Sequence, residues 1–220
     1  MRWLVTGASR GIGRELVRQL EARGDAVVAV VRNPDSLAAA PGREVIACDV
    51  ADGAAVAALA AAIGAGALDV VVNNAGVWPA DGALGQLDHA EVARSFAVNA
   101  AAPLRVTEAL LPALRRGHGK KVVHVSSGLA SIADTSGGWY GYRMAKAALN
   151  MMAATMARDL ARDGIVTAVL DPGWVQTDMG GPGAPTPVAA SVRGLLAQID
   201  ALDRRRSGAF LHWQGGTTPW

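Results

Sequence analysis

Tyr142 and Lys146 stand four residues apart in "YRMAK", inside a stretch with helical spacing. Side chains at this separation project from the same face of a helix. A phenol has a pKa of about 10, which is too high for ready proton exchange near neutrality. A nearby ammonium group stabilises the phenolate and lowers that pKa. The pair therefore predicts general acid catalysis by Tyr142, whereas Tyr140 has Met144 in the partner position.

Three glycines, Gly7, Gly11 and Gly13, lie in "TGASRGIG", between an apolar run and a stretch of helical spacing. Glycine at the end of a strand lets a ligand approach the main chain. The free N–H groups and the dipole of the following helix then favour an anion. The spacing G-x-x-x-G-x-G differs from the dinucleotide fingerprint G-x-G-x-x-G. By itself it predicts a phosphate cradle or, alternatively, only a tight turn.

The rest of the chain alternates apolar strands with alanine-rich helices. We expect strands at Arg2–Gly7 and Ala26–Val31, in runs beginning at Glu44, Leu68, Lys120 and Ile165, and at Gly208–Trp213. We expect helices at Ile12–Arg23, Ala54–Ile63, His89–Arg116, Gly141–Asp163 and Val188–Leu202. This alternation predicts an α/β fold, a doubly wound parallel sheet with helices on both faces, in a single domain spanning 1–220.

Composition narrows the setting. The chain has 220 residues, of which 51% are hydrophobic and 18% charged, with a net charge of +2. The basic run Arg204–Arg206 is interpreted as a solvated helix end rather than a nucleic-acid patch. No apolar run reaches the roughly 18 residues of a membrane span, and no signal peptide precedes the first strand. With the single cysteine Cys48, these features predict a cytoplasmic protein. The spacing of the four histidines does not resemble a zinc site, so no metal is expected.

Several motifs in order then resemble the short-chain dehydrogenase/reductase family over nearly the whole chain. They are "TGASRGIG", "CDV", "NNAG", "VNAAAP", "YRMAK" and "DPGWVQTDM". The stretches "SGGWYGYRMAKAALNM", "PGWVQTDMGG" and "SGAFLHWQGGTTPW" are similar to the C-factor-like and sniffer-like carbonyl reductases. The resemblance implies a Rossmann-type sheet of about seven strands. It also implies a nicotinamide cofactor and reduction of a small aldehyde or ketone to an alcohol, or the reverse.

The resemblance assigns further catalytic roles. Ser127 matches the serine that hydrogen-bonds the substrate carbonyl, although its separation of fifteen residues from Tyr142 is two longer than usual in the family. Ser126, Ser131 and Ser136 therefore stay open as alternatives.

Asn99, in "VNA", matches an asparagine that bends a helix and holds a water against the lysine. The implied proton path runs from solvent through Lys146 and the cofactor ribose to Tyr142. The alternative is an ordinary helix asparagine.

The cofactor is predicted to be NADP(H) rather than NAD(H). An NAD site places a carboxylate after the second strand, where this chain has Arg32. Arg10 matches a position nearby, and guanidinium groups bind a 2′-phosphate in a two-pronged manner. The acid Asp35 is expected to cap the next turn instead. The full set of expected cofactor contacts is Gly7, Ser9, Arg10, Gly11, Ile12, Gly13, Arg32, Asp49, Val50, Asn74, Ala75, Gly76, Tyr142, Lys146, Pro172, Gly173, Val175 and Thr177.

Three tryptophans, Trp78, Trp139 and Trp174, adjoin these motifs. They predict a pocket for aromatic or bulky apolar carbonyl compounds, unless they only pack the fold. The segment Met179–Pro187 is short, which predicts a substrate pocket with an open entrance.

Two other functions stay open: a cofactor-binding signalling or redox-sensing protein of C-factor type, and a ketoreductase acting on carrier-bound substrates. The second requires a basic docking patch, for which the candidates are Arg115, Arg116, Lys120 and Lys121. A homodimer or homotetramer would use the helices near Ala100–Arg116 and Tyr142–Asp163.

Overall fold

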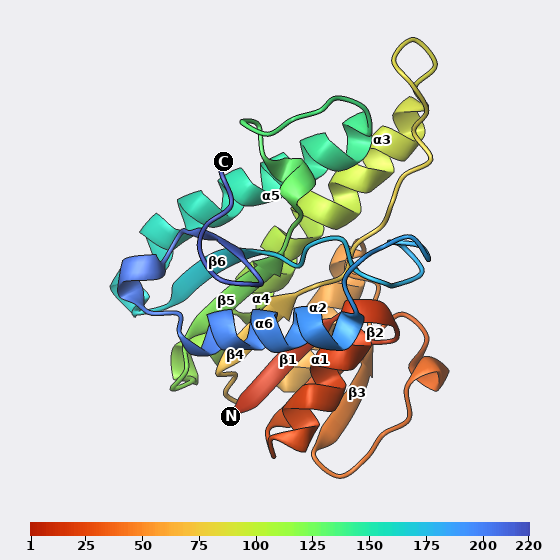
Figure 1. The fold of residues 1–220 in the computed structure, drawn as a ribbon. Helices are drawn as coiled ribbons and strands as arrows, with labels where there is room; N and C mark the ends of the chain where they lie inside the picture. Colours follow the sequence, from red (N-terminus) through yellow and green to blue (C-terminus); the bar gives the residue numbers. More distant parts are fainter.

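The computed structural model describes all of residues 1–220. Seven parallel strands form one sheet in the order β3-β2-β1-β4-β5-β6-β7 (Figure 1). They are β1 Arg2–Thr6, β2 Ala26–Val31, β3 Arg43–Ala47, β4 Val70–Asn73, β5 Lys121–Val125, β6 Val166–Asp171 and β7 Phe210–His212. The sheet is the doubly wound, Rossmann-type arrangement that the sequence predicts, and the strand order reverses between β1 and β4.

Helices cover both faces of the sheet. The bounds are α1 Gly11–Ala22, α2 Gly53–Ile63, α3 His89–Phe96, α4 Ala102–Arg116, α5 Tyr140–Asp159 and α6 Val188–Asp200. Trp3 and Val5 of β1 pack with residues of α1 and α6, which lie side by side in Figure 1. Leu4, between them, packs with residues of α2, α4 and α5 on the other face. Because helices cover both faces of the inner strands, β1, β2, β4, β5 and β6 are buried and mostly apolar along their length, whereas the edge strand β3 is only partly buried.

The expected single helix His89–Arg116 is divided into α3 and α4 by a π-helical turn at Ala97–Ala101. Asn99, in this turn, is fully buried, and its side-chain amide hydrogen-bonds the backbone of Val77 as well as the Ser95 hydroxyl. A wide turn of this kind is common at functional sites. The structure thus shows the helix irregularity that the family resemblance implies at Asn99.

The carboxyl ends of the parallel strands meet at one edge of the sheet. At this edge β1 continues into the glycine loop, β4 into Asn74–Gly76, β5 into Ser126 and Ser127, and β6 into Pro172 and Gly173. The topology therefore brings the glycine loop, "NNAG", the two serines and the segment after β6 to the same side of the molecule.

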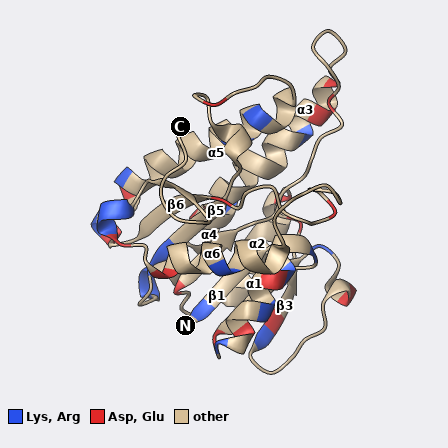
Figure 2. Cartoon of the chain, viewed as in Figure 1, with Lys and Arg blue, Asp and Glu red and all other residues tan.

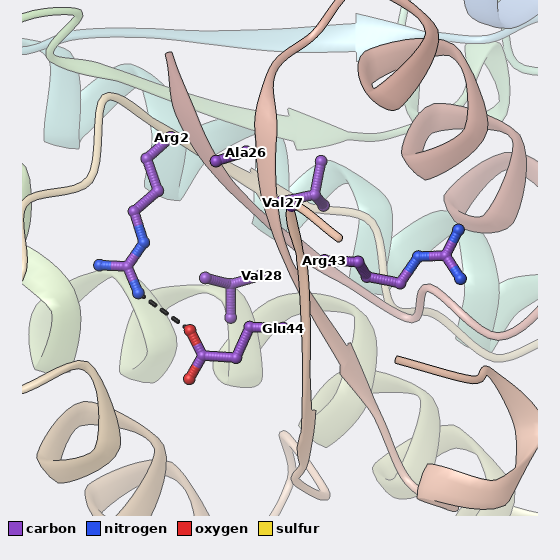
Figure 3. A pocket seen from close by; sticks show the side chains of 7 residues that line it. Arg2, Ala26, Val27, Val28, Arg43 and Glu44 are labelled. Carbon is purple, nitrogen blue, oxygen red and sulfur yellow. Dashed lines mark hydrogen bonds and ion pairs between the residues drawn. The ribbon is translucent and has the colours of Figure 1, made fainter. Parts of the chain in front are cut away.

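The amino edge carries a separate hollow of about 270 Å³, with Arg2, Val28 and Glu44 among its lining residues (Figure 3). Arg2 Nη2 lies 3.0 Å from Glu44 Oε2 across it. Because it lies at the amino ends of β1 to β3, this hollow is remote from the motifs at the carboxyl edge.

Two local expectations have clear outcomes. Asn33, not Asp35, caps the short helix Pro34–Ser36, since the Asn33 side chain accepts from the Asp35 amide. The Arg204–Arg206 run forms the short helical turn η5 (Figure 2).

No helix of the structure has the length and apolar character needed to cross a membrane.

Candidate active site

The glycine loop forms a cradle that has no space for side chains at two of its glycines. Gly7 has a φ of +66°, and an added Cβ there would lie 2.8 Å from the Ala75 Cα. A Cβ on Gly13 would collide with the Gly7 carbonyl oxygen. The amides of Gly11, Ile12 and Gly13 have no backbone acceptor. This cradle fits the phosphate groups of a dinucleotide, as expected at a helix N-terminus.

Asn74 and Thr6 fasten the loop to the strand next to it. Asn74 Nδ2 donates to the carbonyl oxygens of Thr6 and Gly7, at 2.9 and 3.2 Å. The Thr6 hydroxyl accepts from the amides of Asn74 and Ala75, each at 3.0 Å. The two motifs "TGASRGIG" and "NNAG" are therefore one structural unit.

The segment after β6 closes the other side of the cradle. An added Cβ on Gly11 would meet the Thr177 methyl group at 3.2 Å, so the two segments are in contact. Val175 is buried, and the Pro172 carbonyl accepts from Ser191 at 2.8 Å. Gly173, with a φ of +75°, donates to Asp171 Oδ1 at 3.0 Å.

The residues expected near the adenosine half are less constrained. Arg32 and Asp49 are exposed and Val50 is buried. Arg10 is exposed and pairs with Asp178 at 3.2 Å.

Tyr142 and Lys146 lie on one face of α5 and both are buried. Lys146 Nζ donates to the Val125 carbonyl at the end of β5, at 2.8 Å. It lies 5.8 Å from the centroid of the Tyr142 ring. The helical spacing therefore places the two groups together, as the sequence predicts.

The direction of the phenol's pKa shift is the opposite of the expectation. Burial raises the pKa of Tyr142 to about 12, the charge of Asp171 also raises it, and the Ser127 hydroxyl opposes the rise. Burial lowers the pKa of Lys146 to about 8. Desolvation disfavours the charged form of both groups, so the expected lowering of the phenol pKa by the ammonium is wrong for this structure.

Of the four candidate serines, Ser127 is the one whose hydroxyl interacts with Tyr142. Ser126 donates to Asn150 at 2.7 Å. Ser131 accepts from the Asp134 amide, and Ser136 accepts from Arg143.

Asn99 borders the lysine. Its Nδ2 donates to Val77 and Ser95, at 2.9 and 3.0 Å. An added Cβ on Gly76 would lie 2.9 Å from Asn99 Oδ1 and 3.8 Å from Lys146 Nζ. Gly76 thus lies between the asparagine and the lysine.

Two of the three tryptophans gather at the phenol. The Trp78 ring lies 4.6 Å from the Tyr142 ring, and Trp139 meets Trp78 edge-on at 5.9 Å between centroids. Trp78 and Trp139 are 40% and 48% exposed, which leaves area for a ligand. Trp174 instead donates to the Gly180 carbonyl within its own loop, at 2.7 Å.

The basic docking patch does not form beside this site. Arg115 and Arg116 end α4 and Lys121 begins β5, so they lie toward the amino edge. Arg115 pairs with Asp163, and the amine groups of Lys120 and Lys121 donate to main-chain carbonyls.

Sequence inspection missed Asp171 and Arg143. Asp171 is buried at the end of β6 and its charge acts on Tyr142. A charged residue closing an otherwise apolar strand, in "VTAVLDPG", was the available signal. Arg143 stands inside "YRMAK", and no sequence pattern indicates that it contacts the segment between Ser127 and the helix.

Fold and site together define a dinucleotide-binding oxidoreductase with a tyrosine–lysine pair. The family model for short chain dehydrogenases matches residues 2–186. The chain belongs to the short-chain dehydrogenase/reductase family, and as a member it is an enzyme that uses a nicotinamide cofactor.

Individual relatives agree with this assignment. The C-signal of Myxococcus xanthus is 53% identical over 156 residues, which are 70% of this chain and 94% of that protein. The NADPH-bound carbonyl reductase from chicken fatty liver superposes with a TM-score of 0.92 at 30% identity, covering 100% of this chain and 98% of the other. The carbonyl reductase Sniffer of D. melanogaster gives 0.93 at 28% identity, covering 100% and 99%. These similarities confirm the subgroup that the sequence motifs indicate and support a carbonyl-reducing oxidoreductase.

Proposed function

We propose that this enzyme is an NADPH-dependent carbonyl reductase that converts small aldehydes or ketones to alcohols. One observation carries the proposal. Buried Tyr142 and Lys146, with the Ser127 hydroxyl against the phenol, lie at the sheet edge where the glycine loop begins.

Each side chain has a defined part in the proposed reaction. The nicotinamide, when bound, supplies the hydride. Tyr142 donates its proton to the carbonyl oxygen, and its raised pKa keeps it protonated beforehand. Ser127 donates a hydrogen bond to the same oxygen and stabilises the charge that develops there.

Lys146 is the proposed proton reservoir. Because burial lowers its pKa to about 8, its amine gains and loses a proton near neutral pH. Asn99, which borders Gly76 as the lysine does, is proposed to hold a water against this amine. Lys146 remains oriented by the Val125 carbonyl throughout.

The preference for NADP(H) rests on Arg10 and Arg32. Both guanidinium groups are exposed near the carboxyl edge and no acid takes the place of Arg32 after β2. The chicken carbonyl reductase, of the same fold, is described as NADPH-bound. Equilibrium dissociation constants for NADPH and NADH decide the matter; comparable affinities contradict the preference.

The proposed substrates carry an aromatic or bulky apolar group next to the carbonyl. Trp78 and Trp139 present partly exposed rings at the phenol, and flat rings favour stacked or edge-on contacts. Trp174 is left out of this surface because it is held within its own loop.

The decisive experiment is a panel of aldehydes, ketones and quinones followed by NADPH absorbance, with Tyr142→Phe as the blank. Turnover that is equal in the variant would refute the catalytic assignment.

A signalling role is the second candidate, because the C-signal of Myxococcus xanthus is 53% identical over 156 residues. A protein that binds NADPH but turns over no compound of the panel would favour this role over catalysis.

Self-association through α4 and α5 is also proposed. Leu104, Met144 and Met151, on these helices, are large apolar residues exposed by 47%, 55% and 70%. Light scattering on the wild type and on Met151→Glu tests it: a species heavier than 22.5 kDa should revert to the monomer mass.

A further inference from the structure

The segment 127–139 connects the serine that faces Tyr142 to the helix that carries Tyr142. It is the long serine–tyrosine connection noted in the sequence, and apart from the short turn Gly128–Ala130 it has no regular structure. Such a segment needs side-chain contacts to hold one conformation, because ordering each residue costs roughly 1–2 kcal/mol of backbone entropy.

Arg143 makes these contacts from the first turn of α5, in the position directly after Tyr142. Its Nη1 donates to the Leu129 carbonyl at 3.2 Å and its Nε to the Gly137 carbonyl at 3.2 Å. Its Nη2 donates to the Ser136 hydroxyl at 2.8 Å. The guanidinium carbon also lies 5.7 Å from the centroid of the Trp139 ring. One side chain therefore contacts both ends of the segment.

Both ends adjoin groups that the proposed reaction uses. At one end, Leu129 donates its amide to the Ser127 hydroxyl at 3.2 Å. At the other, Trp139 meets Trp78, which lies against the Tyr142 ring. A change at Arg143 therefore reaches the serine and the aromatic surface together.

Trp139 provides independent evidence that the segment is under constraint. Its φ of +49° is in the left-handed region, which a bulky residue rarely adopts. A conformation of this kind persists only where the surroundings enforce it. Two side chains contact the Trp139 ring, the Arg143 guanidinium and the edge-on Trp78 ring, and the Arg143 amide donates to the Trp139 carbonyl.

We propose that Arg143 is a positioning residue that holds segment 127–139 so that Ser127 and Trp139 flank the Tyr142 phenol. This inference rests on the proposed function for its effect on catalysis, whereas the ordering of the segment is independent of it. The geometry requires arginine. A guanidinium has five N–H donors in a rigid plane, while a lysine ammonium cannot reach three separated acceptors and stack on an indole.

The test compares Arg143→Ala and Arg143→Lys with Arg158→Ala, which removes an exposed arginine from the same helix. Hydrogen exchange of peptides covering 127–139 is measured with steady-state kinetics and the NADPH dissociation constant. In both Arg143 variants we expect the segment to exchange at least tenfold faster. The value of kcat/KM for aromatic carbonyl compounds should fall by about 10- to 100-fold, since small misplacements of reacting groups have effects of this size. NADPH affinity should change less than twofold.

Added guanidinium ion should restore part of the kcat of Arg143→Ala and none of that of Tyr142→Phe. Exchange and kinetics equal to those of Arg158→Ala would overturn the proposal, as would full activity in Arg143→Lys. If the wild-type enzyme reduces no carbonyl compound, the proposed function fails. The exchange measurement still decides whether Arg143 orders the segment.

Discussion

Arg10 Nη1 lies 3.2 Å from Asp178 Oδ2, which joins the glycine loop to the segment after β6. Both side chains are more than two-thirds exposed, at 68% and 74%. Such an ion pair is worth at most about 1 kcal/mol. Asp178 therefore neutralises the arginine proposed for the 2′-phosphate without fixing it in place.

Replacing Asp178 with Asn should strengthen NADPH binding by about two- to fivefold, because Arg10 is released and a negative charge is removed. NADH affinity should rise less, because NADH has no 2′-phosphate for the released guanidinium to bind. Arg10→Ala should act in the opposite direction on NADPH alone. Fluorescence titrations at two salt concentrations measure both effects; equal changes for the two cofactors would contradict the role of Arg10.

The phenol titration is the second prediction. The chain has two tyrosines, so a Tyr140→Phe background reports Tyr142 alone. Because burial raises the pKa of Tyr142 to about 12, the phenolate absorbance of the cofactor-free protein should rise only above pH 11. Lys146, with a pKa of about 8, is already neutral there. Lys146→Met should therefore leave the midpoint unchanged, and a large upward shift would show that the ammonium does stabilise the phenolate.

The outcome for Tyr142 shows how far the sequence leads. The spacing of Tyr142 and Lys146 is a local helical relation, so it predicts their proximity correctly. The pKa depends on burial and on Asp171, which is distant in sequence, and the local pattern gives the wrong direction.

The same division applies elsewhere in the molecule. The strands follow from local apolar runs and the glycine loop from its own motif, so the bounds expected from the sequence agree with the structure within a few residues. The break at Asn99 occurs where its side chain bonds Val77 across 22 positions, and Arg143 bonds segment 127–139 as far away as Leu129, 14 positions earlier. No local pattern contains these contacts.

Gly13→Ala is the third prediction. The new methyl group would collide with the Gly7 carbonyl oxygen and approach Asn74 Nδ2 at 2.5 Å. Neither neighbour can move without breaking the bonds that fasten the loop, so the free energy of unfolding should fall by about 1–3 kcal/mol. NADPH binding should weaken at least tenfold. Gly53→Ala is the matched control: its methyl group meets only Arg105 at 3.8 Å, and both properties should stay near wild type.

His124 leads to the last prediction, on acid stability. The imidazole is fully buried on β5, where its Nδ1 lies 3.3 Å from Asn73 Nδ2 and its Nε2 has no partner. Burial, helped by the charge of Lys146, lowers the pKa of His124 to about 3. The unfolded chain has an ordinary histidine pKa of about 6.5.

Between pH 6.5 and 3 the unfolded chain therefore binds a proton that the folded chain does not. The contribution of the neutral, buried His124 to the free energy of unfolding is fully present above pH 6.5. It decreases by about 1.4 kcal/mol per pH unit as the pH drops through this window. His124→Gln keeps an acceptor for Asn73 and removes the titrating group. With falling pH, its free energy of unfolding should therefore decrease less steeply than that of the wild type, by about 1.4 kcal/mol per pH unit. Urea unfolding between pH 7 and 4 measures the slope, with exposed His118→Gln as the control. Parallel pH dependence in wild type and His124→Gln would show that His124 takes up its proton without unfolding the protein.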